Sequence, residues 1–169
     1  GDKETWEKYT LWHESTRVPL VFVAPGVTKP GTVSNQPASL LDVYPTLLEL
    51  AGIEQPGDQL EGTSLVPQLK NPQAAKEPVV CTHQLGNHAV ISSTHRYIRY
   101  ANGDEELYDL VADPAEWNNV AEQESMSAVK AELQKGLPKV NFQMSPGQPR
   151  PKAVPKRNPA NRRQRVTTP

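Results

Sequence analysis

The order of apolar and polar positions predicts a short buried strand near the beginning of the chain. Leu20–Val23 is a continuous apolar run between Pro19 and the sequence Ala24-Pro25-Gly26. Such a run is typical of a strand that is covered on both faces of a sheet. A sheet of that kind needs several strands, and the sequence contains no others of this type. We therefore interpret the first part of the chain as a piece of a larger α/β structure.

The next stretches predict a loop, a helix and a second region of loops. Glycine, proline, serine and asparagine in residues 26–37 predict a loop. Apolar residues in residues 42–53 recur at helical spacing, with Asp42 as the expected N-cap and Gly52 as the expected stop. Frequent prolines in residues 54–78 predict loops with one short helical turn at Leu65–Leu69.

Stretches rich in β-forming residues follow and predict a small antiparallel sheet. They are Val79–Thr82, Ala89–Ser93, Tyr97–Tyr100 and Glu106–Tyr108. The turn sequence at residues 101–104 joins the last two stretches. Asparagine and glycine in such a turn favour direct antiparallel pairing of the strands on either side.

Two helices are expected after the predicted sheet. Asp113 and Glu116, with a proline between them, have the spacing of a capping box at the start of a short helix. Met126, Val129 and Leu133 share one face of a further helix, which a glycine and a proline end.

Composition and charge divide the chain into a body and a tail. Hydrophobic residues make up 36% of the chain and there are 17 prolines, so part of it is not expected to pack. Residues 139–169 carry eight basic residues and no acidic one, which predicts a disordered, proline-rich, basic tail. The net charge of -1 argues against a protein that binds nucleic acid over much of its surface.

Two further classes of protein are excluded by the sequence. No apolar run approaches the roughly 18 residues that a membrane-spanning helix requires. The single cysteine, Cys81, rules out an internal disulfide framework and a zinc site made of cysteines. Its apolar neighbours predict a small core residue rather than a reactive thiol.

Several charged or histidine side chains are candidates for chemistry. Lys8 lies eleven residues before Pro19, which opens the predicted strand. An ammonium group near the end of such a strand could contact an anionic ester. The alternative is a solvated surface lysine, which is the commoner kind. Glu14 and Arg17 are expected to form an ion pair that supports the strand entry. Among the histidines, His88 is the best candidate for a ligand contact, and a half-exposed loop position is the alternative. The acidic run at residues 104–106 is interpreted as solvated turn charge.

Three stretches, read in order, resemble the C-terminal part of the type I sulfatases, with the iduronate-2-sulfatase-like and choline-sulfatase-like members closest. They are GDKETWEKYTLWHESTRVPLVFVAPG (1–26), SLLDVYPTLLELAGI (39–53) and RYIRYANGDEELYDLVADPAEWNNVA (96–121). The resemblance covers residues 1 to about 135, and the basic tail lies outside it.

The resemblance implies an α/β fold, namely the C-terminal portion of an alkaline-phosphatase-like sandwich plus a small antiparallel subdomain with a helix. We expect the last elements of the α/β core in residues 1–76, the subdomain in residues 77–138, and the disordered basic tail in residues 139–169. It also implies hydrolysis of sulfate esters by a formylglycine nucleophile and a calcium ion. This chain has no Cys/Ser-x-Pro-x-Arg motif, so the nucleophile and the metal ligands are expected outside it, and the chain alone is expected to be inactive.

The same resemblance assigns roles to three residues. Lys8 matches the lysine that contacts the sulfate group, and Lys3 and His88 become possible contacts to the sugar or other leaving group. The substrate implied is a sulfate ester of a carbohydrate, with no nucleic acid as partner and with export to the periplasm or the outside. Two alternatives are a non-catalytic remnant that serves as an interaction module, and a phosphodiesterase-type member of the same superfamily.

Overall fold

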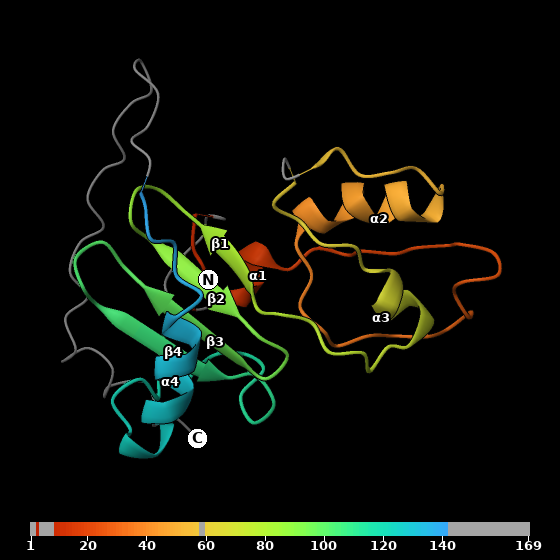
Figure 1. Cartoon of the computed structure of the whole chain (residues 1–169). Coiled ribbons are helices and arrows are strands. Elements are labelled where there is room, and N and C mark those ends of the chain that lie inside the picture. The colour runs from red at the N-terminus through yellow and green to blue at the C-terminus, as the bar shows by residue number, and fades with distance from the viewer. Residues whose placement is uncertain (1–2, 4–8, 58–59, 142–169) are drawn as a thin grey trace.

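A computed structural model of the chain places a four-stranded sheet beside a separate group of helices and loops (Figure 1). The structure describes residue 3, residues 9–57 and residues 60–141. We call residues 9–17 together with residues 77–141 the sheet unit. We call residues 18–57 and 60–76 the helical lobe. The candidate site residue Lys8 and nearly all of the predicted basic tail lie outside the described residues.

The strands of the sheet unit pair antiparallel in chain order. They are β1 (Val79–Thr82), β2 (His88–Ile91), β3 (His95–Arg99) and β4 (Glu105–Asp109). Val80 pairs with Val90, and Tyr97 pairs with Leu107. The predicted antiparallel sheet is therefore confirmed, and short turns set its register because each strand joins the next directly.

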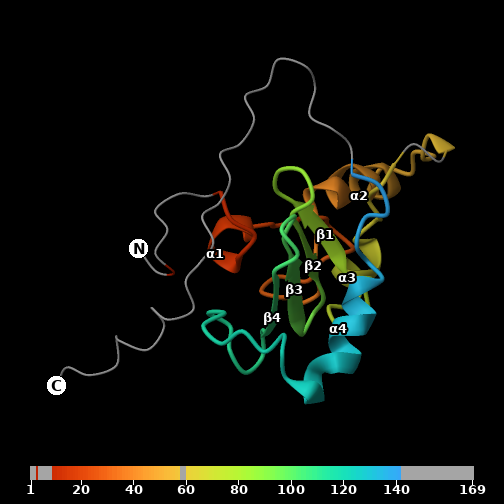
Figure 2. The ribbon, with the colours of Figure 1, turned by 90° about the vertical axis from the view of Figure 1, so that its left-hand side faces the viewer.

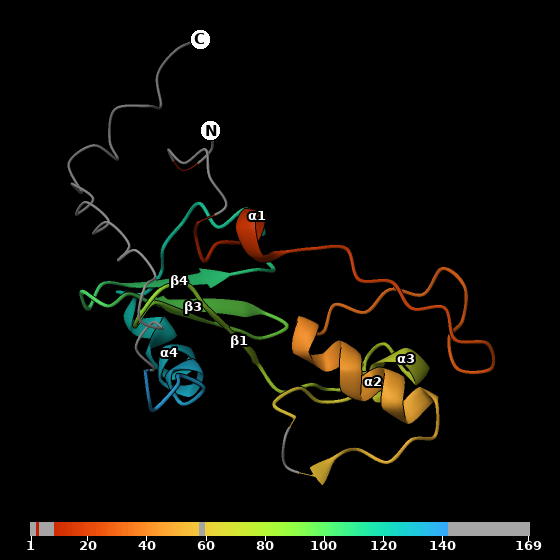
Figure 3. The same cartoon turned by 90° about the horizontal axis from the view of Figure 1, so that it is seen from above.

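The sheet is covered on both faces, with α1 (His13–Thr16) on one side and α4 (Ser127–Gln134) on the other (Figures 2 and 3). Successive side chains of a strand point to opposite faces, so each strand contributes to two apolar clusters. The first cluster contains Leu11, Trp12, Ala89, Ile98 and Tyr108. The second contains Val90, Tyr97, Leu107, Ala121 and Leu133.

The helix expected around residues 126–133 is confirmed as α4, which a short 3-10 helix, η4 (Glu124–Met126), precedes. Leu133 of α4 lies in the second apolar cluster, and Val129 of α4 and Met126 of η4 pack against it, as their predicted shared face requires. The chain therefore closes the sheet with an amphipathic helix on the face opposite α1.

The helical lobe contains η2 (Leu40–Asp42), α2 (Val43–Leu50) and α3 (Val66–Lys70). The predicted helices in residues 42–53 and near residues 65–69 are thus confirmed. Asp42 stands at the N-cap position of α2 as predicted, but its side chain makes no capping bond there. Its carboxylate instead accepts from the backbone N–H of Ser39, the N-cap of the 3-10 turn, in a capping box. Gly52 ends α2 with a φ of 66°, a backbone conformation that glycine adopts without strain.

Polar side chains hold the helical lobe together. The buried Asp42 carboxylate lies 3.0 Å from Lys76 Nζ and accepts from the N–H of Thr63. Thr46 donates its hydroxyl to the carbonyl of Asp42 and accepts from the N–H of Leu65. These bonds join α2 to the loop before α3 through groups that water does not reach.

The strand predicted at Leu20–Val23 is wrong for this structure. The run lies extended but forms no strand in the described part of the chain, and Val21 and Val23 are 81% and 86% exposed. A strand needs a neighbouring backbone to satisfy its N–H and C=O groups, and the described residues place none beside it.

The short helix predicted from Asp113 to Glu116 is also wrong. Residues 114–115 form a turn, and Glu116 takes a left-handed conformation with a φ of 57°. The carboxylate of Glu116 does not return to a capping position, because it enters a buried ionic cluster with Arg96.

Among the described residues, no helix is both long and apolar enough to cross a membrane.

Candidate functional site

The structure places the two described candidate residues on opposite faces of the sheet. Lys3 lies beside Trp12 and Tyr108 on the face that α1 covers. His88 precedes Ala89 in β2, so its side chain falls on the α4 face. Lys8, the third candidate, lies outside the described residues. The structure therefore does not bring Lys3 and His88 into contact.

A buried ionic cluster forms around Glu116 on the α1 face. Arg96 Nε lies 2.5 Å from Glu116 Oε1, and both side chains are almost fully buried. The other carboxylate oxygen of Glu116 accepts from the backbone N–H of His13 at 2.9 Å. Arg96 also donates to the carbonyl of Leu11 and to the hydroxyl of Thr16. One ion pair thus fastens the N-terminal segment to strand β3 and to the loop after β4.

Lys3 joins this cluster from the N-terminal side. Its Nζ lies 3.6 Å from Glu116 Oε2, and 4.8 and 4.7 Å from the ring centres of Trp12 and Tyr108. Burial lowers the pKa of Lys3, and the carboxylates of Glu116, Glu14 and Glu106 oppose that shift. An ammonium group between two aromatic faces and a carboxylate is held in one place.

Glu106 supplies a second buried carboxylate on the same face. Its Oε2 accepts from Trp12 Nε1 at 2.6 Å and from the hydroxyl of Tyr108 at 3.0 Å. Burial and the nearby Glu106 raise the pKa of Tyr108 far above its usual value. The interpretation of residues 104–106 as solvated turn charge is therefore wrong for Glu106, which is 8% exposed.

Other candidates near the N-terminal segment have structural partners. Arg17 Nη1 lies 3.1 Å from His13 Nε2, and the expected Glu14–Arg17 pair does not form among the described residues. Burial, followed by the charge of Arg96, lowers the pKa of His13. Cys81 packs half-buried against the first apolar cluster, and burial raises the pKa of its thiol, as expected of a core residue.

His88 is 2% exposed, and both of its ring nitrogens are engaged. Thr82 Oγ1 lies 2.9 Å from Nδ1, and Asn141 Oδ1 lies 2.7 Å from Nε2. Because an amide oxygen only accepts, Nε2 carries the proton in that contact. The buried imidazole is thus linked by a hydrogen bond to the exposed side chain of Asn141.

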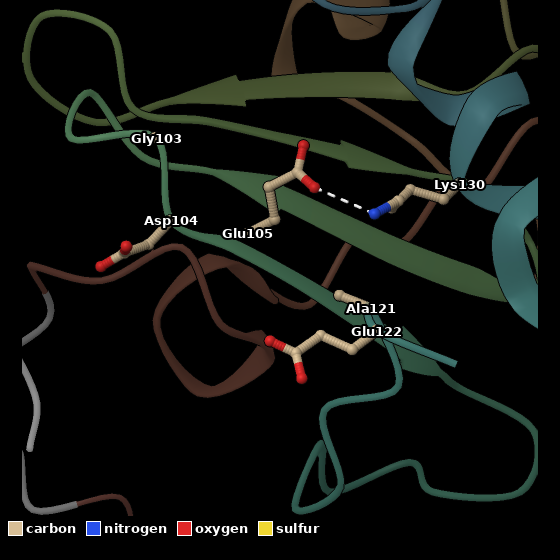
Figure 4. A pocket seen from close by; sticks show the side chains of 6 residues that line it. All are labelled: Gly103, Asp104, Glu105, Ala121, Glu122 and Lys130. Carbon is tan, nitrogen blue, oxygen red and sulfur yellow. Dashed lines mark hydrogen bonds and ion pairs between the residues drawn. The ribbon is translucent and has the colours of Figure 1, made fainter. Parts of the chain in front are cut away.

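A shallow acidic depression of about 360 Å³ lies at the start of β4 (Figure 4). Asp104, Glu105 and Glu122 line it together with Lys130, whose Nζ lies 3.1 Å from Glu105 Oε2. The carboxylates of Asp104 and Glu122 point away from that pair in Figure 4. Glu105 is also bound by Tyr97 and Gln134, so its charge is already compensated within the fold.

Sequence reasoning missed that Arg96, Glu106 and Glu116 are buried on one face of the sheet. Arg96 and Glu106 stand at strand positions that alternate with buried apolar residues, and this period of two places them on the same face as Ile98 and Tyr108. That alternation is the signal from which their burial could have been predicted. The position of Glu116 carried no such signal, because it depends on a left-handed turn.

In the described part of the chain, no group of three or more His, Cys, Asp or Glu side chains is arranged to hold a metal ion. The described residues thus do not fit a calcium site. They do provide a fixed ammonium group at Lys3 and a network that ties the N-terminal segment to the sheet.

Comparison with known proteins identifies the wider family. Residues 1–143 match the family model described as N-sulphoglucosamine sulphohydrolase, C-terminal. The chain belongs to this sulfatase family. The resemblance to the C-terminal part of the sulfatases, within the alkaline-phosphatase-like superfamily, is thereby confirmed.

Individual sulfatases agree with this assignment. A sulfatase of Formosa agariphila is 38% identical over 142 residues, which is 83% of this chain and 28% of that protein. A choline-sulfatase of Rhizobium meliloti is 36% identical over 129 residues, which is 72% of this chain and 25% of that protein. The sulfatase chain described here therefore spans about a quarter of the length of these relatives.

A solved structure supports the fold of this sulfatase chain. The crystal structure of Ps i-CgsB matches with a TM-score of 0.50 and 24% identity, covering 60% of this chain and 23% of that chain. At this level of identity the match concerns the fold alone.

Proposed function

We propose that this chain is the C-terminal portion of a sulfuric ester hydrolase and that it contributes Lys8 to the sulfate-binding site. The observation that carries the proposal is the family match over residues 1–143, which includes Lys8 and the segment around it. An ammonium group donates charge-assisted hydrogen bonds to sulfate oxygens and stabilises the negative charge that develops on the ester oxygen.

Formylglycine and calcium are the groups through which sulfatases of this family act, and we propose that residues outside this chain supply both. The chain has no Cys/Ser-x-Pro-x-Arg motif, and its described residues offer no metal site. The contribution of this chain is then to bind and orient the ester. His88 is proposed to contact the leaving group through Asn141. Lys3 remains a candidate for such a contact, but its ammonium group is buried beside Glu116 on the opposite face of the sheet.

The proposed substrate is a sulfate ester of a sugar. The support is the name of the matching family, which refers to N-sulphoglucosamine. Export to the periplasm or the outside is proposed with it, because external sulfated glycans are the substrates of many sulfatases. Fractionation of cells that produce the protein tests this location, and recovery in the cytoplasmic fraction alone would contradict it.

We further propose that the rest of a complete sulfatase covers the exposed apolar residues of the helical lobe. Val21 and Val23 are exposed in this structure, as are Tyr44 and Leu47 on α2. Relatives about three times as long as this chain support this proposal. Slow amide hydrogen exchange at residues 20–23 in the longer protein would agree with it, and exchange at the rate of an open loop would refute it.

The catalytic proposal is tested by sulfate release from p-nitrophenyl sulfate in the protein that carries this chain. Lys8→Ala is expected to lower kcat/KM by about 10²–10³-fold, the effect of removing one charge-stabilising donor. Lys29→Ala removes the same charge from an exposed loop and is the matched control. Near-normal activity of Lys8→Ala would reject the role of Lys8.

The same assay separates the alternatives. A phosphodiesterase would hydrolyse bis(p-nitrophenyl) phosphate in preference to the sulfate ester. A non-catalytic interaction module would hydrolyse neither ester, whatever residue stands at position 8.

A further inference from the structure

A second depression, of about 570 Å³, lies at the end of the sheet where β3 runs into the turn before β4. We call it the Arg99 groove. Its walls include Leu85 and Gly86 from the β1–β2 loop, Arg99 and Tyr100 from the end of β3, and Asn141. The volume falls in the range of pockets that hold small organic ligands, about 300–1,000 Å³.

The polar wall of the Arg99 groove is positioned by buried groups. Asn141 Oδ1 accepts from His88 Nε2, and Thr82 holds the other nitrogen of the same imidazole. With its oxygen engaged, the amide of Asn141 retains its two N–H donors for another partner. His88 is buried and both of its ring nitrogens are engaged, so its contact fixes the amide at the groove wall.

Arg99 brings a positive charge to the groove that no described carboxylate neutralises. Its cross-strand neighbour Glu105 is bound instead by Lys130, Tyr97 and Gln134. Among the ion pairs of the described residues, none includes Arg99. A guanidinium group in this state suits a sulfate or carboxylate group, to which it can donate two parallel hydrogen bonds.

The remaining walls and the surroundings limit the size of the ligand. Leu85, which is 47% exposed, provides apolar surface beside the charge, whereas the side chain of Tyr100 packs against the first apolar cluster on the other face of the sheet. Gly103 lines both this groove and the acidic depression that contains Asp104 and Glu122. The acidic side chains next to the groove repel a long polyanion, so a short ligand with one anionic group fits better.

We propose that the Arg99 groove binds a short saccharide that carries a sulfate group. The guanidinium of Arg99 would receive the sulfate, the amide of Asn141 would donate to sugar hydroxyls, and Leu85 would contact the sugar ring. The choice of a sulfated sugar rests on the proposed function, whereas the groove and its charge rest on the geometry alone. His88 is in this view a positioning residue that acts through Asn141.

The test is isothermal titration calorimetry with N-acetylglucosamine 6-sulfate, in a Lys8→Ala background that limits turnover of the probe. Arg99→Gln is expected to weaken binding at least tenfold. Arg17→Gln removes the same charge from an exposed residue on the other face and is expected to leave the Kd unchanged. Equal losses in the two variants, or no binding by the parent protein, would overturn the proposal.

Two matched ligands and a second variant sharpen the test. N-acetylglucosamine without sulfate and inorganic sulfate without sugar are each expected to bind at least tenfold more weakly than the sulfated sugar. Equal affinity for either would overturn the assignment of a sulfated saccharide. Asn141→Asp places a carboxylate at an exposed position of the groove wall and is expected to weaken binding even if Arg99→Gln does not fold.

Failure of this proposal is distinguishable from failure of the proposed function. Loss of hydrolysis in Lys8→Ala together with an unchanged Kd in Arg99→Gln would leave the sulfatase assignment standing and reject the groove. Binding that depends on Arg99, in a protein whose hydrolysis of the sulfate ester survives Lys8→Ala, would keep the groove and reject the role of Lys8. Binding that depends on Arg99 in a protein that hydrolyses no sulfate ester would keep the groove and reject the sulfatase assignment.

Discussion

The sheet unit and the helical lobe bury their side chains in different ways. The sheet unit has an apolar cluster on each face, in which Val90, Tyr97, Ile98 and Leu107 are inaccessible to solvent. The lobe buries few large apolar side chains and relies on polar bonds around Asp42. The sheet unit thus contains its own core, whereas much of the apolar surface of the lobe is left without a partner in the described structure.

The difference has a physical consequence for each region. Burial of apolar surface contributes about 25 cal/mol per Å², so most of the stabilisation is expected in the sheet unit. The partly exposed apolar side chains of α2 and of residues 20–23 contribute less of it in this structure. The same truncation should therefore lower the free energy of unfolding more in the sheet unit than in the helical lobe.

The largest expected effect concerns the ionic cluster of the sheet unit. Glu116→Gln leaves the buried guanidinium of Arg96 without a countercharge, and breaking a buried pair in this way costs about 3–5 kcal/mol. We expect a loss of this size in the free energy of unfolding, measured by urea denaturation. The exposed Glu122→Gln is the control, with an expected change below about 0.5 kcal/mol. A small loss in Glu116→Gln would show that Arg96 finds another partner.

The apolar clusters give the next effect. Leu107→Ala opens a cavity in the second cluster and should lower the free energy of unfolding by about 2–5 kcal/mol. Leu47→Ala makes the same truncation at an α2 position that is 51% exposed, where the expected change is below about 0.5 kcal/mol. Hydrogen exchange of the amides in β3 and in α2 measures the two regions separately. Similar losses for both variants would contradict the comparison.

Part of this fold could be predicted from the sequence alone. The strands, α2 and α4 follow from local periodicity and stop signals, and their positions could be predicted to within a few residues. Leu20–Val23 could not be predicted in this way, because a strand depends on neighbours that the pattern of one segment does not contain. Hydrophobic periodicity is a property of one segment, whereas the pairing of a strand depends on the segments that lie beside it.

The candidate site is divided in the same manner. Lys3 and His88 could be chosen by residue type and by resemblance, but not the partners that hold them. Glu116 lies 113 positions from Lys3 in the chain. Its carboxylate reaches the cluster because Glu116 takes a left-handed conformation, whereas the residues before it predicted a helix. Contacts over such distances in the chain become visible only when the fold is known.

The stability of the sheet unit is expected to depend on pH through Tyr97, a member of the second apolar cluster. Burial, together with a hydrogen bond to Glu105, raises the pKa of Tyr97 to about 12. The folded state therefore favours the neutral phenol. The stability that this contributes is fully present below pH 10 and is lost as the pH rises from about 10 towards 12. We expect unfolding in urea to become easier over that range by on the order of 2 kcal/mol.

Tyr97→Phe is the control for this pH effect, because it keeps the ring in the second cluster and removes the ionisable group. The pH dependence between 10 and 12 should be shallower in Tyr97→Phe than in the parent protein. Identical slopes would assign the effect to other groups. Absorbance at the tyrosinate band follows the ionisation directly.

The smallest effect is expected for an ion pair that lies outside both clusters. Lys135 and Glu132 are paired on the exposed side of α4, and each side chain is 71% exposed. Solvent screens such a pair, so Lys135→Gln should change the free energy of unfolding by less than about 1 kcal/mol. Lys130→Gln breaks a pair with Glu105 whose side chains are only 26% and 27% exposed, and a larger loss is expected there. If the two variants lose equal stability, burial is not what distinguishes the ion pairs of the sheet unit.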